Sequence, residues 1–281
     1  MLRVLHLAAY NAGVTVVIIG LSNVPKGNRV LYQLDHFGEV SRRIVSNINA
    51  YLVPFSNIQV KPATTPLFQT NSMTIGSKPV DGGNLILSQQ EFERISSTEP
   101  AATKFIRPYL GANEVIKGII RYCIWVREED KVEAQQKKSL ALRFGKVSEM
   151  RLKSKKGLTR EGASTPHAFQ QVRQNGDERV IVVPSVSSES RSYLPVTVFE
   201  RGIISNRNYG LFDAPLWNMA LIASRLHWVW IGTVCARLEM RFSYTNTLGW
   251  NTFPVPSLTE KNKADLTTCA ENILLAREAH F

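Results

Sequence analysis

Gly13-Val14-Thr15-Val16-Val17-Ile18-Ile19-Gly20 is a short, β-branched run bounded by glycines. Such a run is typical of a strand that is buried on both faces of a mainly parallel sheet. A strand of this kind needs helices over both faces, yet only one possible short helix, Leu2 to Tyr10, precedes it. The sequence therefore predicts the remnant of a sheet whose other strands lie upstream or in another polypeptide.

The segment that follows is irregular. From Val24 to Pro79 the prolines at 25, 54, 62, 66 and 79 interrupt any long element, and Asn47 to Val53 is the best candidate for a short strand. Asp81-Gly-Gly-Asn84 then predicts a turn. We expect loop-rich surface up to this turn.

Two capping boxes predict the start of helices. Ser88 with Glu91 opens one that runs to about Ile95, and Ser257 with Glu260 opens a final helix to about Ala279. The final helix carries an apolar stripe at three-to-four-residue spacing, which could pack internally or dock a partner, with internal packing favoured. The stripe consists of Leu266, Ala270, Ile273 and Leu274.

Further elements alternate in type. Strands are predicted at Arg121 to Val126, at Arg179 to Val183 and at the alternating segment Arg237 to Tyr244. Pro100 begins a short helix that ends before Arg107. Asp213 begins another helix, which is apolar nearly all round from Leu216 to Ile231. We expect His227 in that helix to be a packed core residue. The fold class is therefore predicted as α+β, with a mixed sheet and a helical C-terminal region.

The chain is basic, and its charge is concentrated. Its 281 residues contain 34 Lys and Arg against 23 Asp and Glu, a net charge of +11. The segment from Lys137 to Arg160 holds nine basic residues and one acid, Glu149. Because Met150 to Lys153 alternates, we expect a strand edge here that leads into a flexible basic loop. Such a charge favours a polyanionic partner such as nucleic acid or an acidic membrane surface, and charge alone does not choose between them.

Several classes of protein are excluded by missing motifs. The chain has no G-x-G-x-x-G, G-x-x-x-x-G-K-[ST], H-E-x-x-H or G-x-S-x-G, and its three cysteines form no C-x-x-C clip. No apolar run approaches a membrane span, and the cysteine usage suits the cytoplasm. Two alternatives stay open: a self-contained nuclease using the E-x-K spacing of Glu129 and Lys131, and a non-specific nucleic-acid-binding module that uses only the basic loop.

Segments spread over nearly the whole chain resemble the MmeI-like (type IIL) restriction-modification enzymes, in which one polypeptide carries an endonuclease, an adenine methyltransferase and a DNA target-recognition domain. The similarity rests on these segments in this order: Val14 to Gly20, Gly76 to Leu85, Phe105 to Pro108, Arg121 to Trp125, Val186 to Pro195, Ser224 to Trp228, Ala236 to Glu239, Ser243-Tyr244 and Asn251 to Pro256.

This resemblance implies a domain organisation. Residues 1–24 would be the end of the methyltransferase domain, residues 25–212 the target-recognition domain, and residues 213–281 a C-terminal helical region. The family's cofactor motif and catalytic Pro-Pro loop would lie upstream, so S-adenosylmethionine, and Mg²⁺ for cleavage, are implied for the complete enzyme and no cofactor, metal or catalytic residue for this chain. The implied partners are double-stranded DNA and an upstream methyltransferase domain or subunit, with no membrane.

Recognition of DNA needs cations for phosphates and side chains that match base edges. The first candidate set lies in the basic segment, where Arg151 and Lys153 would point the same way and Glu149 could accept from a cytosine amine; an exposed charged edge that blocks aggregation is the alternative. It comprises Lys146, Glu149, Arg151, Lys153, Lys155, Lys156 and Arg160. The second set would read bases or fix a neighbouring loop, and comprises Ser187, Ser188, Glu189, Arg191 and Tyr193.

Overall fold

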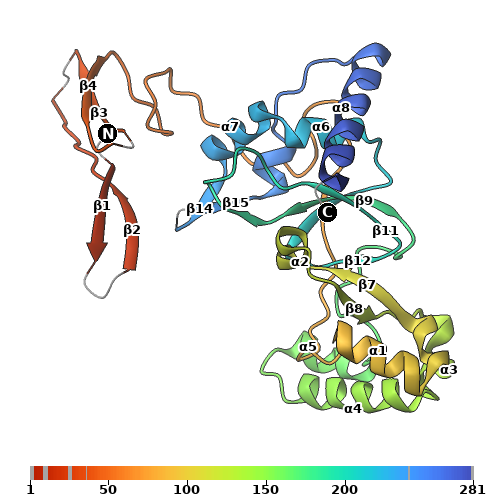
Figure 1. Cartoon of the computed structure of the whole chain (residues 1–281). Coiled ribbons are helices and arrows are strands. Elements are labelled where there is room, and N and C mark those ends of the chain that lie inside the picture. Colours follow the sequence, from red (N-terminus) through yellow and green to blue (C-terminus); the bar gives the residue numbers. More distant parts are fainter. Residues whose placement is uncertain (1–2, 9–11, 25–26, 36, 240, 280–281) are drawn as a thin grey trace.

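The structure, a computed structural model, describes residues 3–8, 12–24, 27–35, 37–239 and 241–279. Figure 1 shows three parts: N-terminal β-ribbons set apart from the rest, a lobe of helices packed on one four-stranded sheet, and a lobe in which a second four-stranded sheet carries the C-terminal helices. None of the helices that the structure describes has both the length and the apolar character needed to cross a membrane.

The N-terminal part consists of two antiparallel ribbons. β1 (Arg3–Ala8) pairs with β2 (Ala12–Val17), and β3 (Arg29–Leu34) pairs with β4 (Val40–Val45). The predicted strand is therefore present in β2, but its partner is antiparallel. The helix predicted from Leu2 to Tyr10 is wrong over Arg3–Ala8, and its remaining residues lie outside the described ones. Ile18 and Ile19 are 64% and 58% exposed, so the expected burial is absent there.

No strand forms between Asn47 and Val53, against the prediction. The side chain of Asn49 accepts hydrogen bonds from the backbone N–H groups of Tyr51 and Val53, and Leu52 has a φ of 60°. An asparagine that bonds its own backbone in this way favours a turn over a strand.

The helical lobe is built on a four-stranded sheet of order β12-β7-β8-β6. Its strands are β6 (Ile86–Ser88), β7 (Ile106–Leu110), β8 (Arg121–Ile124) and β12 (Ile203–Ile204). The predicted turn at residues 81–84, the capping box of Ser88 and Glu91, and the strand from Arg121 are confirmed. The helices are α1 (Gln89–Thr98), η1 (Pro100–Phe105), α2 (Ala112–Lys117), η2 (Glu128–Asp130), α3 (Lys131–Gln135), α4 (Lys138–Leu152), α5 (Gly157–Glu161) and η3 (Gly162–Ser164).

The basic segment is helical, which corrects the prediction of a strand edge and flexible loop between Lys137 and Arg160. Leu140, Phe144, Val147 and Arg151 are spaced by four, three and four residues and are all buried in α4. This spacing is that of one helix face. The alternation of Met150 to Lys153 covered too few residues to distinguish the two periods.

The sheet lobe contains the antiparallel sheet β11-β9-β13-β5. Along β9, Ile181 and Val183 face the main core, whereas Val180 and Val182 face a smaller cluster with Ile204 on the other side. Both faces are thus covered, which explains the continuous apolar run. The strands are β5 (Thr74–Ile75), β9 (Arg179–Pro184), β11 (Thr197–Glu200) and β13 (Asn208–Phe212).

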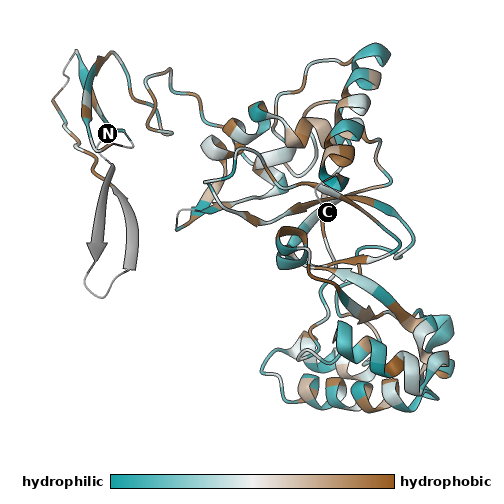
Figure 2. Cartoon of the chain, viewed as in Figure 1, coloured by the Kyte–Doolittle hydropathy of each residue, from teal (hydrophilic) through white to brown (hydrophobic). Residues whose placement is uncertain are grey.

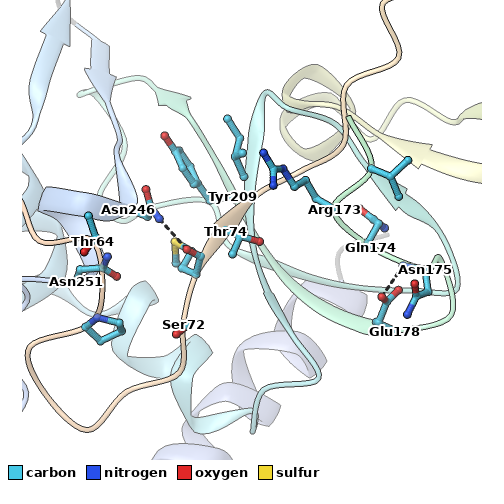
Figure 3. A pocket seen from close by; sticks show the side chains of 14 residues that line it. Thr64, Ser72, Thr74, Arg173, Gln174, Asn175, Glu178, Tyr209, Asn246 and Asn251 are labelled. Atoms are coloured by element: carbon cyan, nitrogen blue, oxygen red, sulfur yellow. Dashed lines mark hydrogen bonds between the residues drawn. The ribbon is translucent and has the colours of Figure 1, made fainter. Parts of the chain in front are cut away.

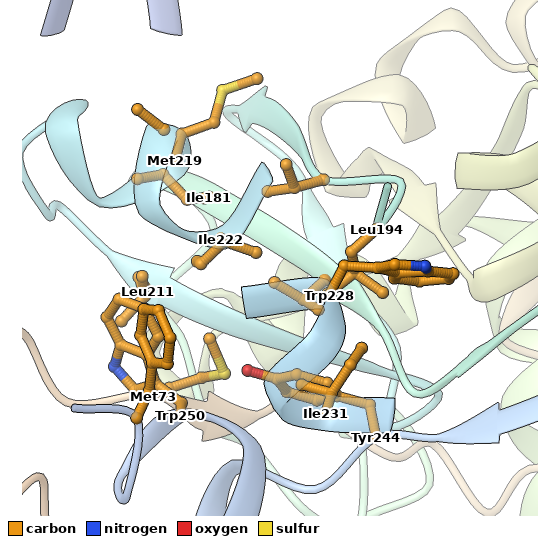
Figure 4. Close-up of a cluster of buried hydrophobic side chains, with 14 of the residues drawn as sticks. Met73, Ile181, Leu194, Leu211, Met219, Ile222, Trp228, Ile231, Tyr244 and Trp250 are labelled. Atoms are coloured by element: carbon orange, nitrogen blue, oxygen red, sulfur yellow. The ribbon is translucent and has the colours of Figure 1, made fainter. Parts of the chain in front are cut away.

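The main core joins this sheet to α6 (Trp217–Ala223), α7 (Arg225–Val234) and α8 (Glu260–Glu278). Met73, Trp228 and Trp250 fill it from separate segments (Figure 4). The helices of the helical lobe mix hydrophilic and hydrophobic residues along their length (Figure 2). The stripe of α8 packs against this core, as favoured from the sequence.

Three predictions for the C-terminal region need correction. The apolar helix begins at Trp217 rather than at Asp213 and is divided at Ser224, which caps α7. The alternating segment is a hairpin, β14 (Ala236–Leu238) and β15 (Arg241–Ser243), turned at Glu239 with a φ of 57°. The capping box of α8 is formed by Thr259 and Asn262 instead of Ser257 and Glu260. A short strand, β10 (Val186–Ser187), pairs with β15.

Candidate nucleic-acid interface

A polar cleft of about 870 Å³ lies where the two lobes join, and we call it the junction cleft (Figure 3). Its walls come from four segments that are distant in sequence: the extended chain before and in β5, the linker that leads into β9, β13, and the short π-helix η4 (Asn246–Trp250) with Asn251 after it. Its polar lining residues are Thr64, Ser72, Thr74, Arg173, Gln174, Asn175, Glu178, Tyr209, Asn246 and Asn251. The prediction from sequence contained none of them.

Main-chain contacts hold the linker against the extended chain. Lys78 forms a β-bridge with Gln171, and the backbone N–H of Arg173 donates to Ser77 Oγ at 2.9 Å. Ser77 itself bridges to Ser205, and the preceding Gly76 allows this approach, because a Cβ there would lie 2.4 Å from the Ser205 carbonyl oxygen. Backbone bridges and the Ser77 hydroxyl therefore fix the linker against the extended chain, with exposed Arg173 at the wall of the cleft.

The side chains of the cleft are suited to hydrogen bonding. Asn246 donates to the Met73 carbonyl oxygen at 2.7 Å, and the Glu178 carboxylate accepts from the backbone N–H groups of Asn175 and Gly176 at 2.6 and 2.7 Å. These bonds orient the loops. Gln174 and Asn251 are buried, whereas Thr74, Arg173 and Asn175 are exposed and present hydroxyl, guanidinium and amide groups at the opening. Such groups match the donors and acceptors of base edges.

The predicted loop from Ser187 to Tyr193 lies beside the hairpin of β14 and β15, because Ser187 pairs with Phe242. Ser188 and Ser190 share a hydrogen bond of 2.8 Å between their hydroxyls, and Arg225 donates to the Ser192 carbonyl oxygen at 3.1 Å. Glu189 is half-buried, and Arg191 and Tyr193 are exposed. Ser187 is only 2% exposed, so its predicted contact with DNA is not retained.

The hairpin adds cations that the sequence prediction missed. Arg241 pairs with Glu239 at 2.8 Å, and the Arg237 guanidinium lies 4.3 Å from the centre of the Phe242 ring. Exposed arginines from three elements, Arg191, Arg225 and Arg241, thus gather near one loop. Because the turn at Glu239 interrupts the alternation, Arg237 pairs with Phe242 and Arg241 with Leu238, so the sequence pattern did not indicate where these arginines would lie.

Arg151 does not contact solvent, and its predicted role as a base-reading residue is wrong. Its side chain is 0% exposed, and its guanidinium donates to five main-chain carbonyl oxygens at 2.8 to 3.0 Å. Burial lowers the pKa of this group. The acceptors are the carbonyls of Pro79, Val80, Gly162, Thr165 and Ala168. The side chain therefore fixes the loops next to the junction cleft.

The other predicted residues of the basic segment lie on the surface of α4, α5 and their connecting loop. Glu149 and Lys153 form an ion pair of 2.5 Å at the C-terminal end of α4, and the hydrogen bond from Lys153 lowers the pKa of Glu149. Arg160 donates to the carbonyl oxygens of Ser154 and Lys155, which holds the corner between the two helices. Lys155 and Lys156 are exposed at this corner. Lys146 lies apart from it, two helical turns before Lys153.

Of the two residues of the nuclease alternative, Glu129 and Lys131, the lysine has a local ion-pair partner. Lys131 pairs with Glu128 at 3.2 Å, and His167 Nε2 lies 3.1 Å from the other Glu128 oxygen, a contact that lowers the pKa of Glu128. His227 is fully buried beside Phe253 and Tyr244, as expected for a core residue. Within the described residues, no group of three or more His, Cys, Asp or Glu side chains is placed to hold a metal ion.

A cleft of hydrogen-bonding side chains, an arginine-rich hairpin and a basic helical corner define the class of nucleic-acid-recognition domains. The family model described as MmeI, target recognition domain, matches residues 54–257, and the chain belongs to this family. DNA methyltransferase A of Bacillus subtilis (strain 168) is 32% identical over 273 residues, which cover 96% of this chain and 30% of that protein.

The fold agrees with a solved relative. The structure of the type IIL restriction-modification enzyme MmeI in complex with DNA matches with a TM-score of 0.83 and 31% identity, over 90% of this chain and 34% of that one. The chain thus spans about a third of the length of these two proteins. The family resemblance and the α+β fold class predicted from the sequence are confirmed.

Proposed function

We propose that this chain is the sequence-specific DNA-recognition region of a restriction-modification DNA adenine methyltransferase, and that it positions double-stranded DNA for base flipping by a catalytic domain upstream. The observation that carries the proposal is the junction cleft, whose hydrogen-bonding side chains lie in a basic chain of the MmeI target-recognition family. The solved MmeI relative was in complex with DNA, which supports the same partner here.

The proposal distinguishes contacts to DNA phosphates from contacts to base edges. Lys153, Lys155, Lys156 and Arg160 at the α4–α5 corner are proposed to bind phosphates, which sets affinity and register without sequence information. The loop residues Ser188, Glu189, Arg191 and Tyr193 and the polar lining of the junction cleft are proposed to match base edges. Arginine can bond guanine O6 and N7 together, a contact worth about 1–3 kcal/mol of discrimination.

The domain boundaries are part of the proposal. Residues 1–24 would complete the methyltransferase domain, residues 25–212 recognise DNA, and residues 213–281 form the C-terminal region. Exposed apolar side chains lie on both sides of the first boundary: Ile18, Ile19 and Val40 line an apolar cavity of about 560 Å³ with Leu31 and Leu52. An apolar surface of this kind suits a protein partner, and we propose the upstream methyltransferase domain or subunit.

The cofactor is assigned to that upstream part. Within the described residues, the lining of the junction cleft includes no glycine, whereas a nucleoside cofactor is commonly held by a glycine-rich turn between a strand and a helix. These residues therefore do not fit S-adenosylmethionine, and we derive no step through it. The Mg²⁺ required for cleavage by the complete enzyme is placed upstream as well, and the cytoplasm is the proposed location.

The phosphate contacts are tested by salt dependence. Lys155→Ala with Lys156→Ala should weaken binding of the full chain to all duplex sequences alike and reduce the slope of log affinity against log salt by about 1.8, which is about 0.9 for each lost contact. Lys117→Ala with Lys261→Ala removes two exposed lysines from α2 and α8 and serves as the control. Fluorescence anisotropy measures both, and an unchanged slope in the first variant would reject the role.

A further inference from the structure

A second concave surface lies on the helical lobe, between α1 and α4. This groove of about 680 Å³ shares no lining residue with the junction cleft. Its lining includes the polar residues Asn84, Thr98 and Ser139 and the apolar residues Ile95 and Leu142. We refer to it as the α1–α4 groove.

The acids of this groove are engaged by neighbouring groups. Glu99 accepts from the backbone N–H groups of Lys138 and Ser139, both at 2.9 Å, and from the Ser139 hydroxyl at 2.5 Å. It thereby caps the start of α4, and these bonds lower the pKa of Glu99. Glu91 caps α1 through the backbone N–H of Ser88 and pairs with Arg143 at 2.5 Å.

The cations outnumber these acids. Arg94, Lys138, Arg143 and Lys146 line the groove with only Glu91 and Glu99 as acids, which leaves an excess of two positive charges. Arg143 is paired, whereas Arg94, Lys138 and Lys146 have no carboxylate within ion-pair distance among the described residues. All three are exposed.

The spacing of these exposed cations indicates the kind of ligand that they can bind. Lys138 and Lys146 are eight residues apart on α4, a rise of about 12 Å along the helix axis. They cannot converge on one small anion, but they match a polymer with repeated charges, since duplex DNA carries about one charge per 1.7 Å of its axis. The capped start of α4 excludes a simple helix-terminus anion site.

We infer that the α1–α4 groove is a second phosphate-binding surface, which holds DNA flanking the stretch engaged at the junction cleft. The inference rests on the proposed function and extends it. Arg94, Lys138 and Lys146 bind backbone phosphates and contribute affinity without sequence preference. Lys146 thus belongs to this surface rather than to the α4–α5 corner.

The test compares two random-sequence duplexes, of about 12 and about 30 base pairs, with the full chain and the variant Arg94→Ala/Lys138→Ala/Lys146→Ala. With the long duplex, three lost contacts should reduce the salt slope by about 2.7, so that between about 50 and 200 mM salt the parent loses about 40-fold more affinity than the variant. With the short duplex, which can still occupy the cleft, the loss should not exceed about twofold. The variant's melting temperature should equal the parent's.

The outcomes separate this inference from the proposed function. An unchanged salt slope with the long duplex overturns the phosphate-binding role of the groove. A large, equal loss with both duplexes shows that the groove is the main binding surface, which supports the groove and overturns the role of the junction cleft. If the variant keeps its DNA affinity and instead loses binding to polyglutamate, the groove binds an acidic protein and the inference is overturned.

Discussion

Replacement of Arg151 by alanine would test the largest correction that the structure makes. The guanidinium spans from the carbonyls of Pro79 and Val80 on one side to those of Gly162, Thr165 and Ala168 on the other. These segments continue into Lys78, which bridges to Gln171, and into the linker at Arg173, which lines the junction cleft. Arg151 therefore joins the helical lobe to the chain that positions the cleft.

The magnitude follows from which carbonyls depend on this side chain alone. Pro79, Gly162 and Thr165 each accept a second hydrogen bond, from Gln170, Thr165 and Ala168 respectively. Among the described residues, the carbonyls of Val80 and Ala168 accept only from Arg151. A buried polar group without a partner costs about 1–3 kcal/mol, so two of them reduce the free energy of unfolding by about 2–6 kcal/mol.

Thermal and urea unfolding, followed by circular dichroism, measure this change. A loss of about 3 kcal/mol should lower the melting temperature by about 6–12 °C. Arg151→Lys should give an intermediate loss, because one ammonium group cannot reach carbonyls on both sides. If Arg151→Ala lost less than about 1 kcal/mol and instead altered sequence preference for DNA, the structural role would be refuted and the base-reading role restored.

Three further changes probe other parts of the chain. Burial lowers the pKa of His227 to about 3. Because the imidazole of the unfolded chain binds a proton near pH 6.5, the free energy of unfolding should fall by about 1.4 kcal/mol per pH unit as the pH drops from about 6 to about 4. Urea unfolding of His227→Asn should lack this contribution to the pH dependence, and an equal slope in the variant would contradict the assignment. Thr259→Ala should cost about 1 kcal/mol through loss of the α8 cap, whereas Ser257→Ala should change stability by less than about 0.5 kcal/mol; the reverse order in thermal melts would contradict the observed cap. In the complete enzyme, Arg191→Ala should change which sequences are methylated while Arg201→Ala should not; sequencing of modified sites tests this, and fixed sites with a slower rate would argue against base contact.

The local elements that sequence predicted well are those with a local cause. Ser88 and Glu91 bond each other's backbone within one turn, so the start of α1 is encoded by neighbouring residues. The apolar run of β9 is buried on both faces, and this run predicts a buried strand without any knowledge of which segments cover it. These features depend on few distant contacts, and the sequence pattern predicts them directly.

The errors arise where a short pattern had two interpretations. Four residues from Met150 alternate, but Arg151 lies on the same face as Val147 and Phe144 and is buried by carbonyls from loops up to 72 residues away. A buried arginine has the same letter as an exposed one, and only tertiary structure distinguishes them. The hairpin tip at Glu239 was missed for a similar reason, because a positive φ at a non-glycine residue leaves no clear signal in sequence.

The junction cleft could not be predicted from the sequence because its position depends on contacts between segments more than 90 residues apart. Arg173 reaches the cleft through its backbone bond to Ser77, and Ser77 is placed by Ser205. None of these bonds uses the side chains of Arg173 or Thr74, so those side chains can vary without loss of the bonds that form the cleft. The wall of the cleft can therefore stay in place while the side chains at its opening change. A recognition domain needs this property if related proteins are to recognise different DNA sequences with one fold.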